Sequence, residues 1–133
     1  MYAMAEMQLT VYDFVHPFGG ALNEGNRWVK LAAATDWVGL ERQYAAHFHK
    51  GGAQALPVRM AFGSLVIRAA LGLSDRQTVE LIREDPYLQY FIGLAAFQHE
   101  APFSAHSMAA FRKRVPERQV TRAVRQFKKL SRG

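Results

Sequence analysis

The stretch that most constrains the fold is Val58–Leu94, because it predicts helices with marked beginnings and ends. Apolar residues recur through its first part with the 3.6-residue spacing of a helix face, and few strongly polar residues interrupt them. Gly72 then suits a helix C-cap, since glycine tolerates positive φ. Ser74 and Gln77 form a capping-box pattern that starts a second helix, and Asp85-Pro86 ends it and begins a third. We therefore expect a largely buried central helix followed by two shorter ones.

Helices are also expected before this stretch. Asn26 is a favourable N-cap for a short helix over residues 27–34, and Thr35 or Asp36 for a second one over about 37–47. Residues 1–25 are broken by proline and glycine, so an irregular lead-in is expected there. Apolar side chains should hold this lead-in on the core: Val11, Phe14, Val15 and Phe18.

Two further helices are expected after a loop over residues 94–103, in which Phe97 and Phe103 should turn inward. Ser104 is placed to cap a helix that runs to about residue 115, and its core-facing side consists of Met108, Phe111 and Val115. Pro116 interrupts this helix, and an amphipathic helix over residues 117–130 follows. Its core-facing residues should be Val120, Val124, Phe127 and Leu130.

No segment alternates apolar and polar residues over a useful length, so the chain is predicted to be all-α, with about five to seven helices. With 133 residues, it is long enough for a single hydrophobic core but not for two. We divide it into a lead-in over residues 1–25, a helical domain over 26–115 and a basic C-terminal helix over 116–133.

The net charge of +6 is unevenly distributed. Residues 112–133 carry a balance of +8, so the residues before them carry −2. Such asymmetry favours a polyanionic partner, nucleic acid first and an acidic membrane surface second. The basic residues of this end are Arg112, Lys113, Arg114, Arg118, Arg122, Arg125, Lys128, Lys129 and Arg132.

Several classes of protein are excluded. The chain has no cysteine, which rules out disulfides and thiol chemistry and fits a reducing compartment. Its first 25 residues lack the basic start and apolar core of a secretory signal, and no run approaches the roughly 18 to 20 apolar residues that span a bilayer. We therefore expect a cytoplasmic protein without a membrane partner. His47 and His49 lack the cysteine or clustered carboxylate of a metal site, and we interpret them as a solvated helix end.

The chain offers little for catalysis. Acidic residues crowd together over residues 80–85, but local ion pairs of Glu80 with Arg76 and Arg83 account for them. There is no Gly-rich phosphate loop and no nucleophile elbow. We predict no catalytic residue, no cofactor, no metal and no small-molecule substrate.

The two basic helices each allow more than one interpretation. The helix over residues 104–115 has an outer face of small residues among basic ones, which suits the major groove, but an ordinary solvated helix shows the same pattern. The loop over 94–103 is longer than a tight turn, so the helices over 75–93 and 104–115 would form a variant helix-turn-helix. The last helix would neutralise phosphates, or act as a linker, or place Phe127 against a partner subunit or a membrane.

A series of sequence blocks also carries a resemblance to a known family. The most specific block is LGLSDRQTVELIREDPYLQYFIGL over residues 71–94. The others are FGG at 18–20, LNEGNRWVKLA at 22–32, Asp36-Trp37, EAPF at 100–103 and FRKRV at 111–115. In this order they resemble the InsH-type N-terminal domain of bacterial insertion-sequence transposases of the insertion-sequence-five and related groups. The resemblance covers most of residues 12–115.

This resemblance implies a role on the ends of a mobile element, and the chain departs from the family in two respects. Similar proteins often carry an acidic residue near position 104, where this chain has Ser104, Ala105 and His106. They also continue into a catalytic domain with three metal-binding acidic residues, which have no counterpart here. We therefore expect no strand-transfer activity, and either a truncated transposase or a competitor that occupies the element ends.

The function we predict is binding of double-stranded DNA at the terminal repeats of an insertion element, in the bacterial nucleoid. Lys113 and Arg114 are the first choices for reading bases, with Arg112 third because it lies nearer the core side. The alternative is a module for transposase dimerisation, which would form a homodimer or join a transposase subunit and use the basic tail only as a linker. The candidate DNA-binding residues are Ser104, His106, Ser107, Ala110, Arg112, Lys113, Arg114, Arg118, Arg122, Arg125 and Lys129.

Overall fold

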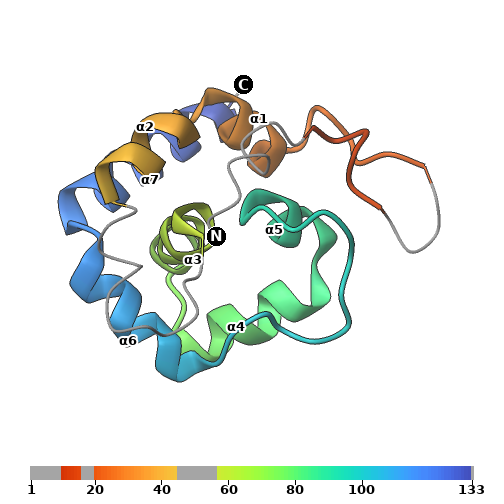
Figure 1. The fold of residues 1–133 in the computed structure, drawn as a ribbon. Helices are drawn as coiled ribbons and strands as arrows, with labels where there is room; N and C mark the ends of the chain where they lie inside the picture. The colour runs from red at the N-terminus through yellow and green to blue at the C-terminus, as the bar shows by residue number, and fades with distance from the viewer. Residues whose placement is uncertain (1–9, 16–19, 45–56, 133) are drawn as a thin grey trace.

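The computed structural model describes residues 10–15, 20–44 and 57–132, and these residues form seven helices (Figure 1). The predicted all-α class is confirmed, since the β-type pairing within the described residues is a single bridge between Val15 and Ala96. The helices are α1 (Arg27–Ala34), α2 (Trp37–Tyr44), α3 (Val58–Leu71), α4 (Asp75–Glu84), α5 (Pro86–Phe91), α6 (Ala105–Arg114) and α7 (Glu117–Arg132).

The central helix of the molecule is α3, which Figure 1 shows almost end-on with α2, α4, α5, α6 and α7 around it. Every residue from Val58 to Ile67 is buried, which confirms the prediction and extends it to the polar residues Arg59 and Ser64. The helix ends as expected at Gly72, which has a φ of 66° and whose N–H donates to the carbonyl of Arg68. This one helix therefore supplies the surface on which the others pack.

Local capping signals set most of the helix starts. The capping box between Ser74 and Gln77 is formed, with the Gln77 N–H 3.1 Å from the Ser74 hydroxyl and the Ser74 N–H 2.9 Å from the Gln77 amide oxygen. Asp85 ends α4 and accepts from the first N–H groups of α5, and Asn26 caps α1. Ser104 occupies the N-cap position of α6, but its side chain accepts no capping hydrogen bond.

The lead-in packs on the core with one difference from the prediction. Val11 and Phe14 are buried as expected, but the side chain of Val15 is 64% exposed. Its main chain makes the attachment instead, since the Val15 N–H donates to the carbonyl of Ala95 and the Val15 carbonyl accepts from the N–H of Phe97, each at 2.9 Å. The predicted anchor Phe18 lies outside the described residues.

A buried arginine, which the sequence had not marked out, joins three helices. Arg59 is 2% exposed, and its guanidinium donates from Nε to the carbonyl of Phe91 at 2.9 Å and from Nη2 to the carbonyl of Tyr90 at 3.0 Å. The same group lies 4.5 Å from the ring centroid of Trp37. It therefore connects α3 to the end of α5 and to the start of α2.

The loop between α5 and α6 is fixed by a buried amide. The Gln89 side-chain nitrogen donates to the carbonyls of Ile82 and Gln98, and its oxygen accepts from the Gln98 N–H at 2.8 Å. Of the two phenylalanines predicted to turn inward, Phe103 is buried and Phe97 is half-buried. These contacts attach the loop to α4 and so determine where α6 begins.

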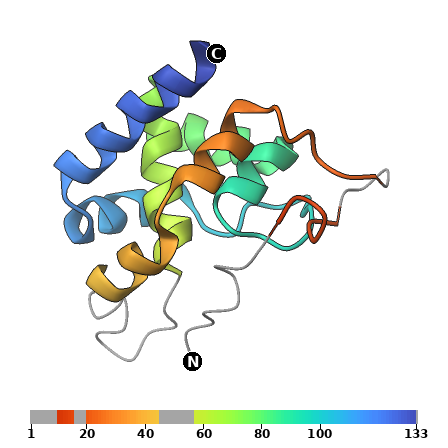
Figure 2. The same ribbon diagram turned by 90° about the horizontal axis from the view of Figure 1, so that it is seen from above.

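The basic helix α7 packs on α1 and α3 as part of the same core (Figure 2). Its buried residues are Val120, Ala123 and Phe127, and the Phe127 ring stacks on Trp28 with the centroids 4.2 Å apart. The suggestion that Phe127 lies against a partner subunit or a membrane is therefore wrong, because its ring is only 4% exposed within its own domain. The helix also extends two residues past the predicted end.

Candidate nucleic-acid interface

The outward face of α6 is the face that the sequence predicted. Met108 and Phe111 are buried, and Val115 follows them into the core. The exposed residues at the start and along the outer side of the helix are Ser104, His106, Ala109, Arg112 and Lys113, and those at its margins are Ser107, Ala110 and Arg114, which are half-buried. Small side chains thus lie between basic ones on the surface that faces solvent.

Among the candidate residues, Arg112 makes a bidentate contact with a carboxylate of α4. Its Nη1 lies 2.6 Å from Oδ1 of Asp75 and its Nη2 lies 3.1 Å from Oδ2 of the same carboxylate. Arg68 donates from Nε to Oδ1 of Asp75 at 2.8 Å. The hydrogen bond from Arg112 lowers the pKa of the Asp75 carboxyl below its ordinary value, and the same contact raises the pKa of Arg112. This ion-pair cluster joins α3, α4 and α6.

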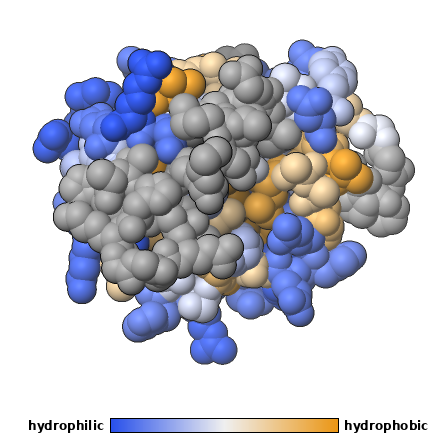
Figure 3. Space-filling view, viewed as in Figure 1, coloured by the Kyte–Doolittle hydropathy of each residue, from blue (hydrophilic) through white to orange (hydrophobic). Residues whose placement is uncertain are grey.

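The remaining candidates form a stripe along α7. Arg118, Arg122, Arg125 and Lys129 are all exposed, and their spacing of four, three and four residues puts them on one side of the helix. With a rise of 1.5 Å per residue the stripe is about 16 Å long. Figure 3 shows hydrophilic side chains gathered along the edge where α7 lies in Figure 1. We call these four residues the basic stripe.

A shallow hollow at the start of α7 is lined by residues of the basic stripe. It is about 420 Å³ in volume and its lining includes Glu117, Thr121 and three arginines of the stripe. A second hollow of about 300 Å³, between α3, α6 and α7, shares Glu117 and Thr121 with the first and is also lined by Arg68 and Arg112. Glu117 and Thr121 therefore lie between the two arginines of the cluster and the basic stripe.

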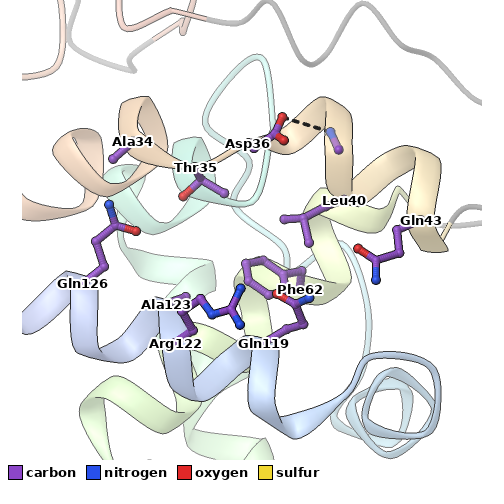
Figure 4. Close-up of a pocket in the computed structure, with 11 residues that line it drawn as sticks. Ala34, Thr35, Asp36, Leu40, Gln43, Phe62, Gln119, Arg122, Ala123 and Gln126 are labelled. Atoms are coloured by element: carbon purple, nitrogen blue, oxygen red, sulfur yellow. Dashed lines mark hydrogen bonds between the residues drawn. The ribbon is translucent and has the colours of Figure 1, made fainter.

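A groove on the other flank of the stripe separates α7 from the turn between α1 and α2 (Figure 4). Its volume is about 310 Å³, its floor includes Phe62, and Arg122 extends its guanidinium toward it. Asp36 at the rim accepts from the N–H of Gly39 at 3.0 Å, which identifies Asp36 as the residue that starts α2. The other polar side chains of the groove are amides and a hydroxyl, from Gln43, Gln119, Gln126 and Thr35.

The acidic residues of α4 form local ion pairs, and one of the two predicted pairs of Glu80 is present. Glu80 pairs with Arg83 at 3.0 Å, and Glu84 lies 3.5 Å from the same guanidinium. The second predicted pair, between Arg76 and Glu80, is not among the ion pairs of the described residues.

Residues 10–15, 20–44 and 57–132 contain no group of three or more metal-binding side chains. His47 and His49 lie outside them. No helix in the described part of the chain is long and apolar enough to cross a membrane.

The fold and this surface define a small all-helical domain with basic side chains concentrated on two adjoining helices. Residues 17–114 match the family described as a transposase domain (DUF772), and the chain belongs to this family. The resemblance drawn from the sequence blocks is therefore confirmed. The matched region ends with α6 and does not include α7.

An uncharacterized protein of Rhizobium meliloti, named ORF8 in the nfe locus, is 33% identical over 94 residues, which are 71% of this chain and 45% of that protein. The chain thus spans less than half the length of this relative. No solved structure matches the chain.

Proposed function

We propose that this transposase domain binds double-stranded DNA, and that it recognises the terminal repeats of an insertion element. The observation that carries the proposal is the basic stripe on α7, a helix that begins three residues after the end of α6. Four cations along about 16 Å of helix match the dense negative charge of a DNA backbone. In this proposal the domain positions DNA in the bacterial nucleoid and contributes no catalytic group.

The two helices have different roles in this proposal. The basic stripe contacts phosphates, which gives affinity without sequence information. Helix α6 packs on α4 and, with α4 and α5, serves as a variant helix-turn-helix that presents α6 to the major groove. Ala109 and Ala110 let the helix approach the bases, while Lys113 and Arg114 reach their acceptor groups.

The alternative, a protein-interaction module whose apolar helical faces mediate transposase dimerisation, has less support from α7. On this helix Val120, Ala123 and Phe127 are buried within the domain, and the Phe127 ring stacks on Trp28. A test of self-association with Phe127→Ala would therefore measure unfolding of the domain instead of an interface.

The proposal is tested by fluorescence anisotropy with two duplex probes, one of random sequence and one carrying the terminal repeats, at several salt concentrations. For Arg122→Ala with Arg125→Ala, the slope of log affinity against log salt should fall by about 1.8 on both probes, since each phosphate contact contributes about 0.9. For Lys113→Ala with Arg114→Ala, the preference for the terminal repeats should fall by about tenfold or more.

The matched control is Arg42→Ala with Arg76→Ala, which removes two exposed cations from α2 and α4. It should leave both the slope and the preference close to those of the unaltered domain. Failure of the unaltered domain to bind either probe at low salt would refute DNA binding. Equal affinity for both probes would support non-specific DNA binding by a basic domain and would refute recognition of element ends.

A further inference from the structure

We propose that Asp75 determines the sequence preference of the DNA-binding face, because it directs Arg112 to hold α6 in place and keeps Arg112 and Arg68 away from DNA phosphates. This inference rests on the DNA binding proposed above. It makes Asp75 a positioning residue that acts through two arginines.

The first support is the geometry of the cluster. One carboxylate accepts from both Nη atoms of Arg112 and from Nε of Arg68, over 2.6 to 3.1 Å. A two-pronged contact of this kind fixes the direction of a guanidinium as well as its position. Because Arg112 belongs to α6 and Asp75 is the first residue of α4, the contact sets the orientation of the proposed reading helix on its support.

The second support is the location of the cluster. Arg68 and Arg112 line the hollow that adjoins the start of the basic stripe across Glu117 and Thr121. Their side chains are 38% and 42% exposed, so neither is locked inside the core. Without the carboxylate, both cations would stand beside the stripe and within reach of the same DNA backbone.

The consequence is a difference between two effects on binding. A phosphate contact raises affinity for every sequence alike and steepens the salt dependence. An ion pair that orients α6 changes only the affinity that depends on reading bases. Asp75 thus limits the number of phosphate contacts and supports the reading of bases by α6.

Two variants test the inference with the same two probes and salt series. Asp75→Asn should steepen the salt slope on random DNA by about 0.9 to 1.8, which corresponds to one or two added phosphate contacts. It should also reduce the preference for the terminal repeats several-fold. Arg112→Gln should reduce that preference while leaving the slope unchanged, because Arg112 does not contact phosphate in the unaltered domain.

The matched control is Glu80→Gln, which removes one negative charge from the same helix but whose partner is Arg83. It should change neither slope nor preference. Circular dichroism at the assay temperature establishes that each variant is folded. If Asp75→Asn does not fold, the salt slope and the preference of Arg112→Gln still decide the test.

Three results would overturn the inference. They are an unchanged slope for Asp75→Asn, an equal steepening for Glu80→Gln, and a slope for Arg112→Gln that is shallower by about 0.9. The last would mean that Arg112 itself contacts phosphate. Each of these leaves DNA binding by the unaltered domain intact, whereas absence of binding by the unaltered domain refutes both proposals.

Discussion

Arg59 shows how a charged group is accommodated in the core of this domain. A buried guanidinium is costly unless nearby groups offset its lost hydration. Here the carbonyls of Tyr90 and Phe91, at the C-terminal end of α5, accept its hydrogen bonds, and Trp37 covers it with a ring face. Because a helix C-terminus carries partial negative charge, Arg59 acts as a cap supplied to α5 by another helix.

We predict that Arg59→Met lowers the free energy of unfolding by about 2 to 4 kcal/mol, since it leaves two carbonyls without their charged donor. Urea denaturation followed by circular dichroism measures the change. Arg42→Met, at an exposed position of α2, is the control and should change stability by less than about 0.5 kcal/mol. Equal effects of the two substitutions would contradict the role given to Arg59.

Asp75 gives the stability of the domain a pH dependence. Its pKa is lowered in the folded state, first by the hydrogen bond from Arg112, so its stabilising contribution is present above the ordinary value of 3.8. The contribution is lost as the pH falls through the lowered pKa of the folded state. For partly exposed partners we expect about 1 kcal/mol at neutral pH.

The measurement is the free energy of unfolding of the unaltered domain and of Asp75→Asn across the acidic range. The difference between them should be constant from pH 7 down to about pH 5 and should shrink toward zero below pH 3.8. A difference that stays constant throughout would show that the carboxylate charge is not what stabilises the cluster.

At the scale of helices, the two serine N-caps offer a comparison within one molecule. Ser74 accepts from the N–H of Gln77, whereas Ser104 makes no side-chain capping bond. We predict that Ser74→Ala destabilises the domain by about 1 kcal/mol, and that Ser104→Ala costs no more than a few tenths. Thermal unfolding of both variants measures the difference, and equal costs would contradict the capping geometry.

Helix boundaries were predictable because their signals are local. Asn26, Ser74, Gly72 and the Asp85-Pro86 pair each act on the chain within a few residues, and the helices begin or end beside them. The buried polar residues were not predictable in this way. Gln89 bonds a loop nine residues away, and Arg59 bonds carbonyls more than 30 residues away, so neither leaves a local pattern.

The candidate interface likewise has features that the sequence predicts and a contact that it does not. The outward face of α6 and the stripe on α7 follow from helical periodicity, which the sequence displays directly. The engagement of Arg112 depends on Asp75, which lies 37 positions earlier in the chain, and no spacing rule relates the two. Periodicity thus identifies which side chains face solvent, but not which of them already have a partner.

At the scale of the whole molecule, α7 is part of the structure that holds the domain together. It packs on both α1 and α3, and Phe127 fills the space beside Trp28. We predict that Phe127→Ala lowers the free energy of unfolding by about 3 to 4 kcal/mol. Lys128→Ala, at the exposed neighbouring position, should leave it within about 0.5 kcal/mol.

Chemical denaturation monitored by circular dichroism compares these two variants. A small effect of Phe127→Ala would mean that α7 docks independently of this ring. A large effect would show that deleting α7 unfolds the domain as well as removing its basic residues. A loss of DNA binding in such a shortened chain could then not be assigned to the lost charge.

The packing of Phe127 on Trp28 also gives the domain an optical property. Trp28 and Trp37 are its two tryptophans, and both are buried, one beneath α7 and the other beside the Arg59 guanidinium. Their indole emission should respond to two different events. The emission of Trp28 should respond to the docking of α7, and that of Trp37 to disruption of the packing around Arg59. With Trp37 or Trp28 replaced by phenylalanine in turn, the light emitted by the remaining indole reports one event at a time, without any added label.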